Sequence, residues 1–286
     1  MTADRRACSP DLARASEAIA TRGLSLGVPL SIAPETGSTN DDAKHGAREG
    51  APHGAVWLAE SQTVGRGRQG RAWLSPRGEN LLFSVLLRLR CAPARVPPVS
   101  LVVGLAVRDA VARALGPAAD ADVVVKWPND VMVRGAGGAL RKVAGVLVES
   151  ALAGAKVEYV VVGIGINVHT RALPDDVAAI ATSIAIERDA RGEGGSLPEL
   201  ERAEILADVL AGLERDVELV AHKGLGHVHA RLTRHDALMG RAVESVGDGN
   251  VRGTASGIDS DGRLLVRRDD GTLVHVSSGE MRLRLA

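Results

Sequence analysis

NLLFSVLLRLR at residues 80–90 and VSLVVGLAVRDAVARALG at residues 99–116 follow one another in the chain and decide its fold class. The first stretch is an apolar run of strand length. The second places Val103, Val107 and Val111 on one helical stripe, and Gly116 ends it. A buried strand followed by an amphipathic helix indicates a sheet with helices packed against it.

The same alternation extends outward from this pair in both directions. Further strands are predicted at residues 54–60, 122–127, 143–150 and 157–166, and helices at 11–21 and 197–222. The second of these helices carries Leu206, Leu210, Leu213 and Val217 on one face, as expected for a helix that packs on a sheet. The predicted architecture is therefore a mixed α/β (α+β) sheet with packed helices.

After residue 235 the chain changes to short β runs separated by closely spaced turn signals. These signals are Asp-Gly-Asn at 248–250, Asp-Ser-Asp-Gly at 259–262 and Asp-Asp-Gly at 269–271. We therefore expect two domains, a large one at residues 1–235 and a small C-terminal β-barrel at residues 236–286.

Composition excludes several classes of protein. Lys+Arg and Asp+Glu both number 35, so no overall charge attracts nucleic acid or a membrane surface. Only two cysteines occur and no Cys-x-x-Cys, which argues against a disulfide framework or a thiolate metal site and fits a reducing cytoplasm. No stretch has the length of a membrane span or the pattern of a signal peptide. Residues 1–30 hold a single short helical pattern, too little for a DNA-binding module at that end.

Residues 60–80, ESQTVGRGRQGRAWLSPRGEN, hold the most unusual motif. Residues 65–70 match Gly-x-Gly-x-x-Gly, but Pro76 and Gly78 break the helix that a dinucleotide-binding fingerprint needs. A Walker loop is excluded because no Gly-Lys-Ser or Gly-Lys-Thr closes the segment. Arginines interleaved with glycines can still bind a small polyanion, through backbone N–H groups and planar guanidinium groups. The loop alone fits equally well a solvated surface loop or an RNA-binding arm.

Gly-Ser-Thr-Asn at residues 37–40 precedes two aspartates. Ser38 followed by Asp41 resembles a capping box that opens a helix. Hydroxyls and an amide at a helix mouth also suit a ligand with a urea-like head, which offers donors and acceptors side by side.

Lys-Trp-Pro-Asn-Asp at residues 126–130 ends a predicted strand, and Pro-Asn-Asp is an ordinary turn signal. The motif also places Lys126, Asn129 and Asp130 at a strand end, where α/β proteins commonly bind ligands. Asp130 offers an oxygen ligand for Mg²⁺.

Two later strands carry polar or glycine positions among apolar residues. Lys142 opens KVAGVLVES, where it either reaches water or acts as a point charge against an anion, with Gly145 allowing close backbone approach. In VVVGIGINV at residues 160–168, Gly163 and Gly165 weaken a strand unless something approaches it, and Asn167 offers an amide that suits adenine.

These segments, in the order GSTN, ESQTVGRGRQGRAW, KWPND, KVAGVLVE and VVGIGIN, resemble the catalytic domain of biotin-protein ligases. The motifs cover residues 37–168, and the C-terminal module is similar to the small SH3-like barrel of that family. The resemblance implies an enzyme that uses ATP and Mg²⁺ to make biotinyl-5'-AMP and transfers biotin to a lysine of a biotin carboxyl carrier protein or domain. It also implies a monofunctional ligase, without the helix-turn-helix domain or the specific DNA binding of bifunctional members.

The resemblance assigns roles residue by residue. The expected biotin-binding residues are Ser38, Thr39, Asn40, Gln62, Arg66, Gly67, Arg68, Lys142 and Gly145. The expected ATP-binding residues are Arg66, Arg68, Arg71, Trp73, Lys126, Asn129 and Asn167. Lys142, Arg68 and Asp130 are expected to be catalytic, and Asp130 is the expected Mg²⁺ ligand.

Two alternatives remain at this point. A lipoate-protein ligase or octanoyl transferase acylates the same kind of carrier lysine, although the full GRGRQGR string and the C-terminal module favour biotin. An RNA-binding protein that uses the arginine-glycine loop belongs to a different class, and the balanced charge and five aromatic residues argue against it. The sequence leaves open the carrier, the oligomeric state (a homodimer included), the task of the C-terminal barrel, and that of residues 188–196.

Overall fold

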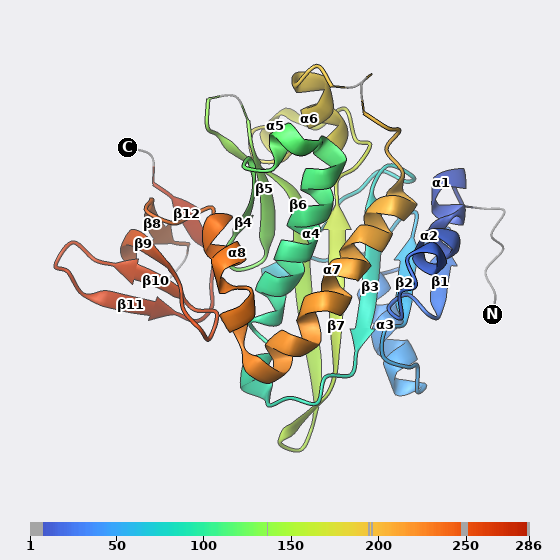
Figure 1. The fold of residues 1–286 in the computed structure, drawn as a ribbon, viewed down its shortest axis with the longest axis horizontal. Helices are drawn as coiled ribbons and strands as arrows, with labels where there is room; N and C mark the ends of the chain where they lie inside the picture. The colour runs from blue at the N-terminus through green and yellow to red at the C-terminus, as the bar shows by residue number, and fades with distance from the viewer. Residues whose placement is uncertain (1–7, 136, 194, 196, 247–250, 285–286) are drawn as a thin grey trace.

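The computed structural model describes residues 8–135, 137–193, 195, 197–246 and 251–284. Within these residues seven strands form one mixed sheet in the order β1-β2-β3-β7-β6-β5-β4 (Figure 1). Its strands are β1 (Leu30–Ala33), β2 (Val56–Ala59), β3 (Leu81–Leu87), β4 (Val123–Lys126), β5 (Asp130–Arg134), β6 (Leu140–Ala153) and β7 (Lys156–Ile166). Only the β1–β2 pair in this sheet is parallel. The predicted mixed sheet is confirmed.

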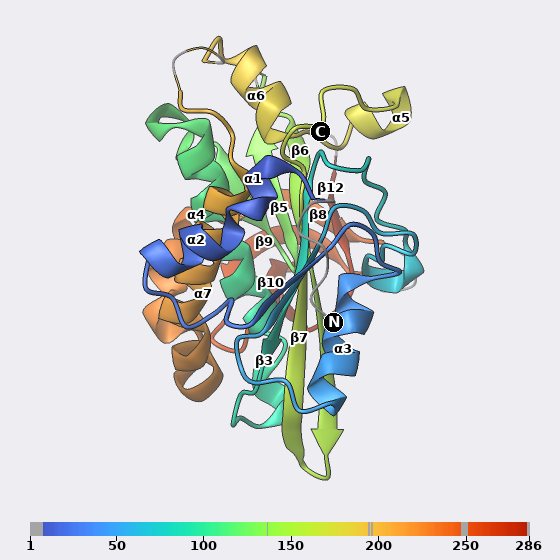
Figure 2. The same cartoon turned by 90° about the vertical axis from the view of Figure 1, so that its right-hand side faces the viewer.

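Helices cover both faces of this sheet. Figure 2 shows α1, α2, α4 and α7 on one side of the strands and α3 on the other. One face is covered by α4 (Val99–Leu115), with α7 (Arg202–Lys223), α1 (Pro10–Ala13) and α2 (Ala15–Thr21) packed over it. The other face carries α3 (Thr39–Arg48). Shorter helices are α5 (Asp175–Ala178), α6 (Ile184–Ala190) and α8 (His229–Arg234), and single 3₁₀ turns are η2 (Arg68–Gly70), η3 (Pro93–Arg95), η4 (Pro117–Ala119) and η5 (Leu225–His227).

The helix α4 has the predicted bounds and is nearly all buried. It ends at Gly116, whose φ of +90° suits a residue without a side chain. The helix α7 begins later than residue 197, because Pro198 precedes it and the chain becomes helical only after Glu201. The predicted helix at 11–21 is present as α1 and α2, two short helices interrupted at Arg14.

The segment at residues 188–196, whose task is left open by the sequence analysis, begins inside α6, and its residues 194 and 196 lie outside the described residues. The Arg188 guanidinium is nearly buried and donates through Nε to the carbonyl of Ala114 at 2.8 Å, in the last turn of α4. It also donates to the carbonyl of Pro198 at 2.6 Å. Arg188 therefore satisfies backbone acceptors at the end of α4 and has a structural task.

The C-terminal module is a second, antiparallel sheet in the order β11-β10-β9-β8-β12. Its strands are β8 (Ala242–Ser245), β9 (Arg252–Ile258), β10 (Leu264–Arg267), β11 (Leu273–Val276) and β12 (Met281–Leu283), and β11 and β12 are its two edges, so it is not closed within the described residues. The predicted Asp-Gly-Asn turn at 248–250 lies outside the described residues.

This module is fixed to the large sheet at two places. Residues 235–237 continue the large sheet beyond its edge strand, because Val125 N–H donates to His235 O at 2.8 Å and Ala237 N–H donates to Val125 O at 2.9 Å. The buried indole of Trp127 donates to Gly262 O at 3.0 Å in the β9–β10 turn. The KWPND segment therefore lies where the two sheets meet (Figure 1). None of the helices in the described ranges combines the length and apolar character needed to cross a bilayer.

Candidate active site

The floor of the candidate site is the α3-facing side of β7. Along this strand Val160, Val162, Ile164 and Ile166 enter the main core, whereas Tyr159 and Val161 pack against α3. By the alternation of a strand, Gly163 and Gly165 lie on the α3 side and leave bare backbone there. A Cβ at Gly163 would lie 2.1 Å from Asn40 Oδ1, and one at Gly165 would lie 2.6 Å from the Trp73 ring. The two glycines therefore make room for two side chains of the site.

At one end of this floor, the first turn of α3 presents a buried polar group. Asn40 Nδ2 donates to Glu149 Oε2 at 2.7 Å, and Ser84 Oγ lies 2.6 Å from Asn40 Oδ1. Glu149 also accepts a hydrogen bond from Lys44 Nζ at 2.9 Å. Burial by itself raises the pKa of the Glu149 carboxyl, but the hydrogen bonds from Asn40 and Lys44 outweigh it and hold that pKa below its ordinary value. Asn40 is therefore oriented by a charged group.

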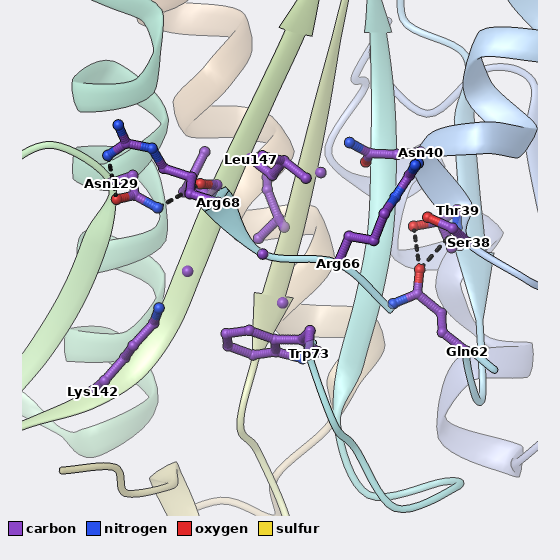
Figure 3. A pocket seen from close by; sticks show the side chains of 16 residues that line it. Ser38, Thr39, Asn40, Gln62, Arg66, Arg68, Trp73, Asn129, Lys142 and Leu147 are labelled. Atoms are coloured by element: carbon purple, nitrogen blue, oxygen red, sulfur yellow. Dashed lines mark hydrogen bonds between the residues drawn. The ribbon is translucent and has the colours of Figure 1, made fainter. Parts of the chain in front are cut away.

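Gln62 closes the same end from the start of the arginine-glycine loop. Its Oε1 accepts from the Thr39 N–H at 2.8 Å and from the Thr39 hydroxyl at 3.1 Å (Figure 3). This side-chain oxygen satisfies a backbone donor of the first turn of α3. The predicted Ser38 capping bond is not formed by its side chain, although Ser38 is the N-cap residue.

Residues 65–73 form a narrow hairpin over the floor. The Gly67 N–H donates to Arg71 O at 2.7 Å, and the Trp73 N–H donates to Gly65 O at 2.9 Å. Gln69 at the tip has a φ of +58°. Arg66 forms an ion pair with Asp41 on α3, which fixes one side of the hairpin above Asn40. The absence of an α-helix here agrees with the rejection of a dinucleotide fingerprint.

On the other side of the hairpin, Arg68 reaches the turn between β4 and β5. Its Nη1 donates to Asn129 Oδ1 at 3.1 Å, and Asn129 Nδ2 donates to Val146 O at 2.9 Å. Burial lowers the pKa of the Arg68 guanidinium, which nevertheless stays charged at neutral pH. In Figure 3 Arg66 and Arg68 diverge from the hairpin toward opposite ends of the cavity.

Lys142 lies at the centre of the site because of a β-bulge. The β5–β6 register steps from Val131–Ala144 to Met132–Lys142, which leaves Val143 as an extra residue on β6. The extra residue brings Lys142 to the face on which Gly145 opens, since a bulge changes which side successive residues point to. A Cβ at Gly145 would lie 3.0 Å from Lys142 Nζ.

The Lys142 ammonium contacts both a carboxylate and a ring. Its Nζ lies 2.6 Å from Asp130 Oδ1 and 5.3 Å from the centroid of the Trp73 ring. The second distance is that of a cation–π contact. The Trp73 indole N–H is buried and has no hydrogen-bond partner among the described residues, so it is a donor available to a ligand.

These groups line two adjoining cavities. All nine residues predicted to bind biotin line the first cavity. The second is lined by Arg71, Lys126 and Asp130, and the two cavities share Gly67, Arg68, Trp73, Asn129 and Lys142. Asn167, the first residue after β7, lines neither cavity. Its Nδ2 donates to Thr182 O at 3.0 Å. Apart from Asn167, the structure thus brings the predicted site residues together.

Several residues of the site were not predicted, and three of them hold other site residues in place. Ser84 and Glu149 orient Asn40, and Glu280 of the C-terminal module lines the second cavity and pairs with Arg71. Ser84 left a signal, because it is a single polar residue within an otherwise apolar strand. Glu280 left none, since it precedes a short strand far away in the sequence.

The charge pattern of the second cavity suits an anion. Lys126, Lys142, Arg68 and Arg71 face Asp130 and Glu280 there. Within the described ranges no three His, Cys, Asp or Glu side chains are close enough to hold a metal ion. A single carboxylate is nevertheless what Mg²⁺ commonly uses when it binds together with substrate phosphates, so Asp130 fits a magnesium ion that arrives with a nucleotide.

Comparison with known proteins agrees with this geometry. Residues 33–167 match the Biotin/lipoate A/B protein ligase family, and residues 239–284 match the Biotin protein ligase C terminal domain. The chain is 34% identical over 254 residues to a biotin--[acetyl-CoA-carboxylase] ligase of Mycobacterium tuberculosis, a match that covers 88% of each chain. It is 36% identical over 235 residues to the bifunctional ligase/repressor BirA of Salmonella typhimurium, covering 82% of this chain and 68% of that protein.

A solved structure is similar over nearly its whole length. The biotin protein ligase from Aquifex aeolicus in complex with biotin and ATP superposes with a TM-score of 0.69 at 29% identity, covering 89% of this chain and 98% of the other. Both the large sheet and the C-terminal module thus have counterparts in known ligases. The chain belongs to the biotin protein ligase family.

Proposed function

We propose that this chain activates biotin with ATP as biotinyl-5'-AMP and transfers the biotinyl group to a lysine of a biotin carboxyl carrier domain. One observation carries the proposal: two cavities of different character meet at Arg68, Trp73 and Lys142. One is lined by hydroxyls and amides at the start of α3, and the other by cationic side chains. Two anionic substrates that enter from the two ends would meet at the shared residues.

The first cavity suits the ureido head of biotin. That head has N–H donors beside a carbonyl acceptor, and Ser38, Thr39, Asn40 and Gln62 offer matching hydroxyls and amides. Gly163 leaves room for Asn40 at the bottom of this cavity. Arg66 and Gly67 cover the ligand from the hairpin, and Leu147 provides an apolar wall for its ring system and chain.

The second cavity suits the nucleotide. Lys126 and Arg71 supply charge for the phosphates, and Asn129 holds Arg68 toward the shared region. Trp73 offers a ring face for adenine and an unpartnered indole N–H. For Asn167 to read the adenine edge, as the resemblance implies, its amide must leave Thr182 O. We retain Asp130 as the protein ligand of the magnesium carried by ATP; the ion supplies charge neutralisation at the phosphates when bound.

In the adenylation step a carboxylate oxygen of biotin attacks the α-phosphorus of ATP, and pyrophosphate leaves. Lys142 lies in both cavities, so its ammonium can hold the two anions together and stabilise the charge that develops in the transition state. Arg68 contributes a second fixed cation from the hairpin. Asp130 keeps Lys142 oriented through their 2.6 Å ion pair.

In the transfer step the amine of the carrier lysine attacks the acyl carbon, and AMP leaves. The attacking amine loses a proton, and Asp130 lies next to Lys142 as an acceptor. The hairpin at residues 65–73 covers the adenylate until the carrier arrives and so excludes water, which would hydrolyse the mixed anhydride. Arg68→Gly removes the contact with Asn129, so this variant should label bystander lysines more strongly than the unmodified chain.

Each domain has a part in this proposal. We propose that residues 1–235 form the catalytic domain and residues 236–286 the C-terminal SH3-like domain, with Glu280 reaching back to Arg71 of the hairpin. The described residues of one chain line both cavities.

A direct experiment tests the proposal against its enzymatic relatives and an RNA-binding role. The chain is incubated with ATP, Mg²⁺ and either biotin, lipoate or octanoate, and the acyl-adenylate is identified by mass. We expect biotinyl-AMP, because the polar groups at the start of α3 would be left unpaired by an octanoyl chain or a dithiolane ring. A lipoyl or octanoyl adenylate in place of biotinyl-AMP would overturn the choice of biotin. Thermal stabilisation by RNA, and none by biotin with ATP, would contradict the enzymatic role.

A further inference from the structure

Both ends of the arginine-glycine loop, residues 60–80, meet at one buried guanidinium. Arg202 Nη1, from the first residue of α7, donates to Glu60 Oε2 at 2.8 Å and to Asn80 O at 3.1 Å. The side chains of Arg202 and Glu60 are each only 1% exposed. The two ends are also joined directly, because the Gly78 N–H donates to Glu60 O at 3.1 Å. The loop therefore leaves and re-enters the fold at a single point.

The other edge of the same guanidinium holds the first helix. Arg202 Nε and Nη2 donate to the two oxygens of Asp11 in α1, at 2.7 and 2.8 Å. The Ser9 N–H donates to the other carboxylate oxygen of Glu60, Oε1, at 2.6 Å. Arg202 thus connects α1, α7 and the base of the loop.

Asn80 continues the connection to the floor of the site. Its Oδ1 accepts from the Val168 N–H at 2.9 Å and from the Thr170 hydroxyl at 3.0 Å, directly after β7. Its Nδ2 donates to Ser75 Oγ at 3.0 Å, within the loop itself. The end of the loop that follows Trp73 is consequently fixed to the strand that carries Gly163 and Gly165.

The cluster around Arg202 places opposite charges in direct contact. One guanidinium faces the carboxylates of Asp11 and Glu60, with His169 Nε2 at 3.7 Å from Asp11. Burial alone raises the pKa of the Asp11 carboxyl, but the hydrogen bonds from Arg202 and His169 outweigh it and hold that pKa well below its usual range. A buried ion pair is no more stabilising than a well-packed apolar group would be, and the best-attested use of such a pair is to fix one arrangement of the chain.

We propose that Arg202 is a positioning residue for biotinylation. It fixes both ends of the arginine-glycine loop and thereby sets how far Gln62, two residues after Glu60, and Trp73, seven residues before Asn80, reach into the two cavities. Arg202 lines neither cavity and acts through the loop alone. The inference rests on the proposed function for its catalytic consequence, but the anchoring itself can be tested without it.

The test of anchoring compares three variants in limited trypsin digestion, each well below its unfolding midpoint. Arg202→Lys keeps the charge but loses the planar guanidinium that bridges Asp11, Glu60 and Asn80. Asp11→Asn alters the partly exposed end of the cluster and serves if the first variant does not fold. Arg14→Ala is the matched control, because it removes a nearby exposed ion pair with Glu201 and leaves the loop contacts intact.

We expect cleavage after Arg66, Arg68 and Arg71 of the hairpin at residues 65–73, located by mass, to be about tenfold faster in the first two variants. That is the effect of losing one charge-assisted hydrogen bond on a local opening equilibrium. The Arg14→Ala control should be cleaved at the rate of the unmodified chain. Variants that lose thermal stability but keep that loop cleavage rate would overturn the anchoring role.

The catalytic consequence is read from the same proteins by steady-state kinetics and bystander labelling. We expect the KM for biotin and the escape of biotinyl-AMP to rise by a similar factor in Arg202→Lys and Asp11→Asn, with a smaller change in the kcat of pyrophosphate release. A merely structural residue would change the unfolding midpoint and leave KM and escape unchanged, and that result would overturn the positioning role. If the unmodified chain makes no biotinyl-AMP, the proposed function fails, while the cleavage rates still decide the anchoring.

Discussion

Gly165→Ala adds one methyl group under the Trp73 ring. The backbone of Gly165 lies outside the left-handed region, so alanine introduces no backbone strain. Its Cβ, however, would lie 2.6 Å from Trp73 Cε2 and 2.8 Å from Cζ2. Since carbon atoms in contact prefer about 3.5–4.0 Å, the ring must move by roughly 1 Å. Trp73 lies on a loop and Gly165 in the interior of the large sheet, so we expect the loop to move and the sheet to remain.

Overpacking of this kind costs about 1–3 kcal/mol, and here the cost falls on the closed position of the loop. A penalty of that size corresponds to roughly a 5- to 150-fold change in an equilibrium constant. We therefore expect the KM for ATP in biotin-dependent pyrophosphate release to rise within that range, with little change in the unfolding midpoint.

Gly163→Ala is the matched control on the same strand. Its Cβ would lie 2.1 Å from Asn40 Oδ1, at the other end of the site. It should raise the KM for biotin more than that for ATP. A KM for ATP in Gly165→Ala equal to that of the unmodified chain would refute the placement of the nucleotide against Trp73.

Two further predictions concern charges away from the shared residues. Glu280→Gln removes the ion pair with Arg71 of the hairpin, whose side chain is 59% exposed. If this pair helps to hold the hairpin over the adenylate, its loss should raise bystander labelling, by no more than about fivefold because exposed pairs are weak. A fall in labelling would contradict that role. The depressed pKa of Asp11 means that its contribution to stability is complete above the ordinary value of 3.8 and is lost as the pH falls below it. The free energy of unfolding in urea is measured for the unmodified chain and for Asp11→Asn between about pH 7 and pH 3. The difference between the two proteins should shrink as the pH falls. A difference that does not change with pH would count against the buried pair.

Much of the fold could be predicted because its signals are local. The bounds of α4 follow from an uninterrupted apolar helix that ends at a glycine, and β3 and β7 are apolar runs of strand length. The strand β5 was missed because it begins inside the Pro-Asn-Asp turn and is only five residues long. The β-bulge at Val143, which brings Lys142 to the site, has no sequence signal, since it depends on how β5 and β6 pair.

The candidate site was predictable where its residues lie in short motifs. Ser38, Thr39 and Asn40 do come together with Gln62 and the hairpin, and the glycines of β7 do admit larger side chains. Contacts made between distant segments could not be predicted. Arg202 and Glu60 are 142 positions apart, and one isolated ion pair leaves no periodic pattern in a sequence.

Biotin-dependent pyrophosphate release by Lys142→Ala shows whether Lys142 brings the two substrates together. Lys142 lines both cavities, as Arg68 does, and lies 2.6 Å from Asp130, so its loss removes the ammonium proposed to bring the two anions together. Lys156→Ala, at the exposed start of β7, is the matched control. We expect Lys142→Ala to lower the rate by about 10²–10³-fold and Lys156→Ala to keep the rate of the unmodified chain. Near-normal release by Lys142→Ala would contradict that role of Lys142.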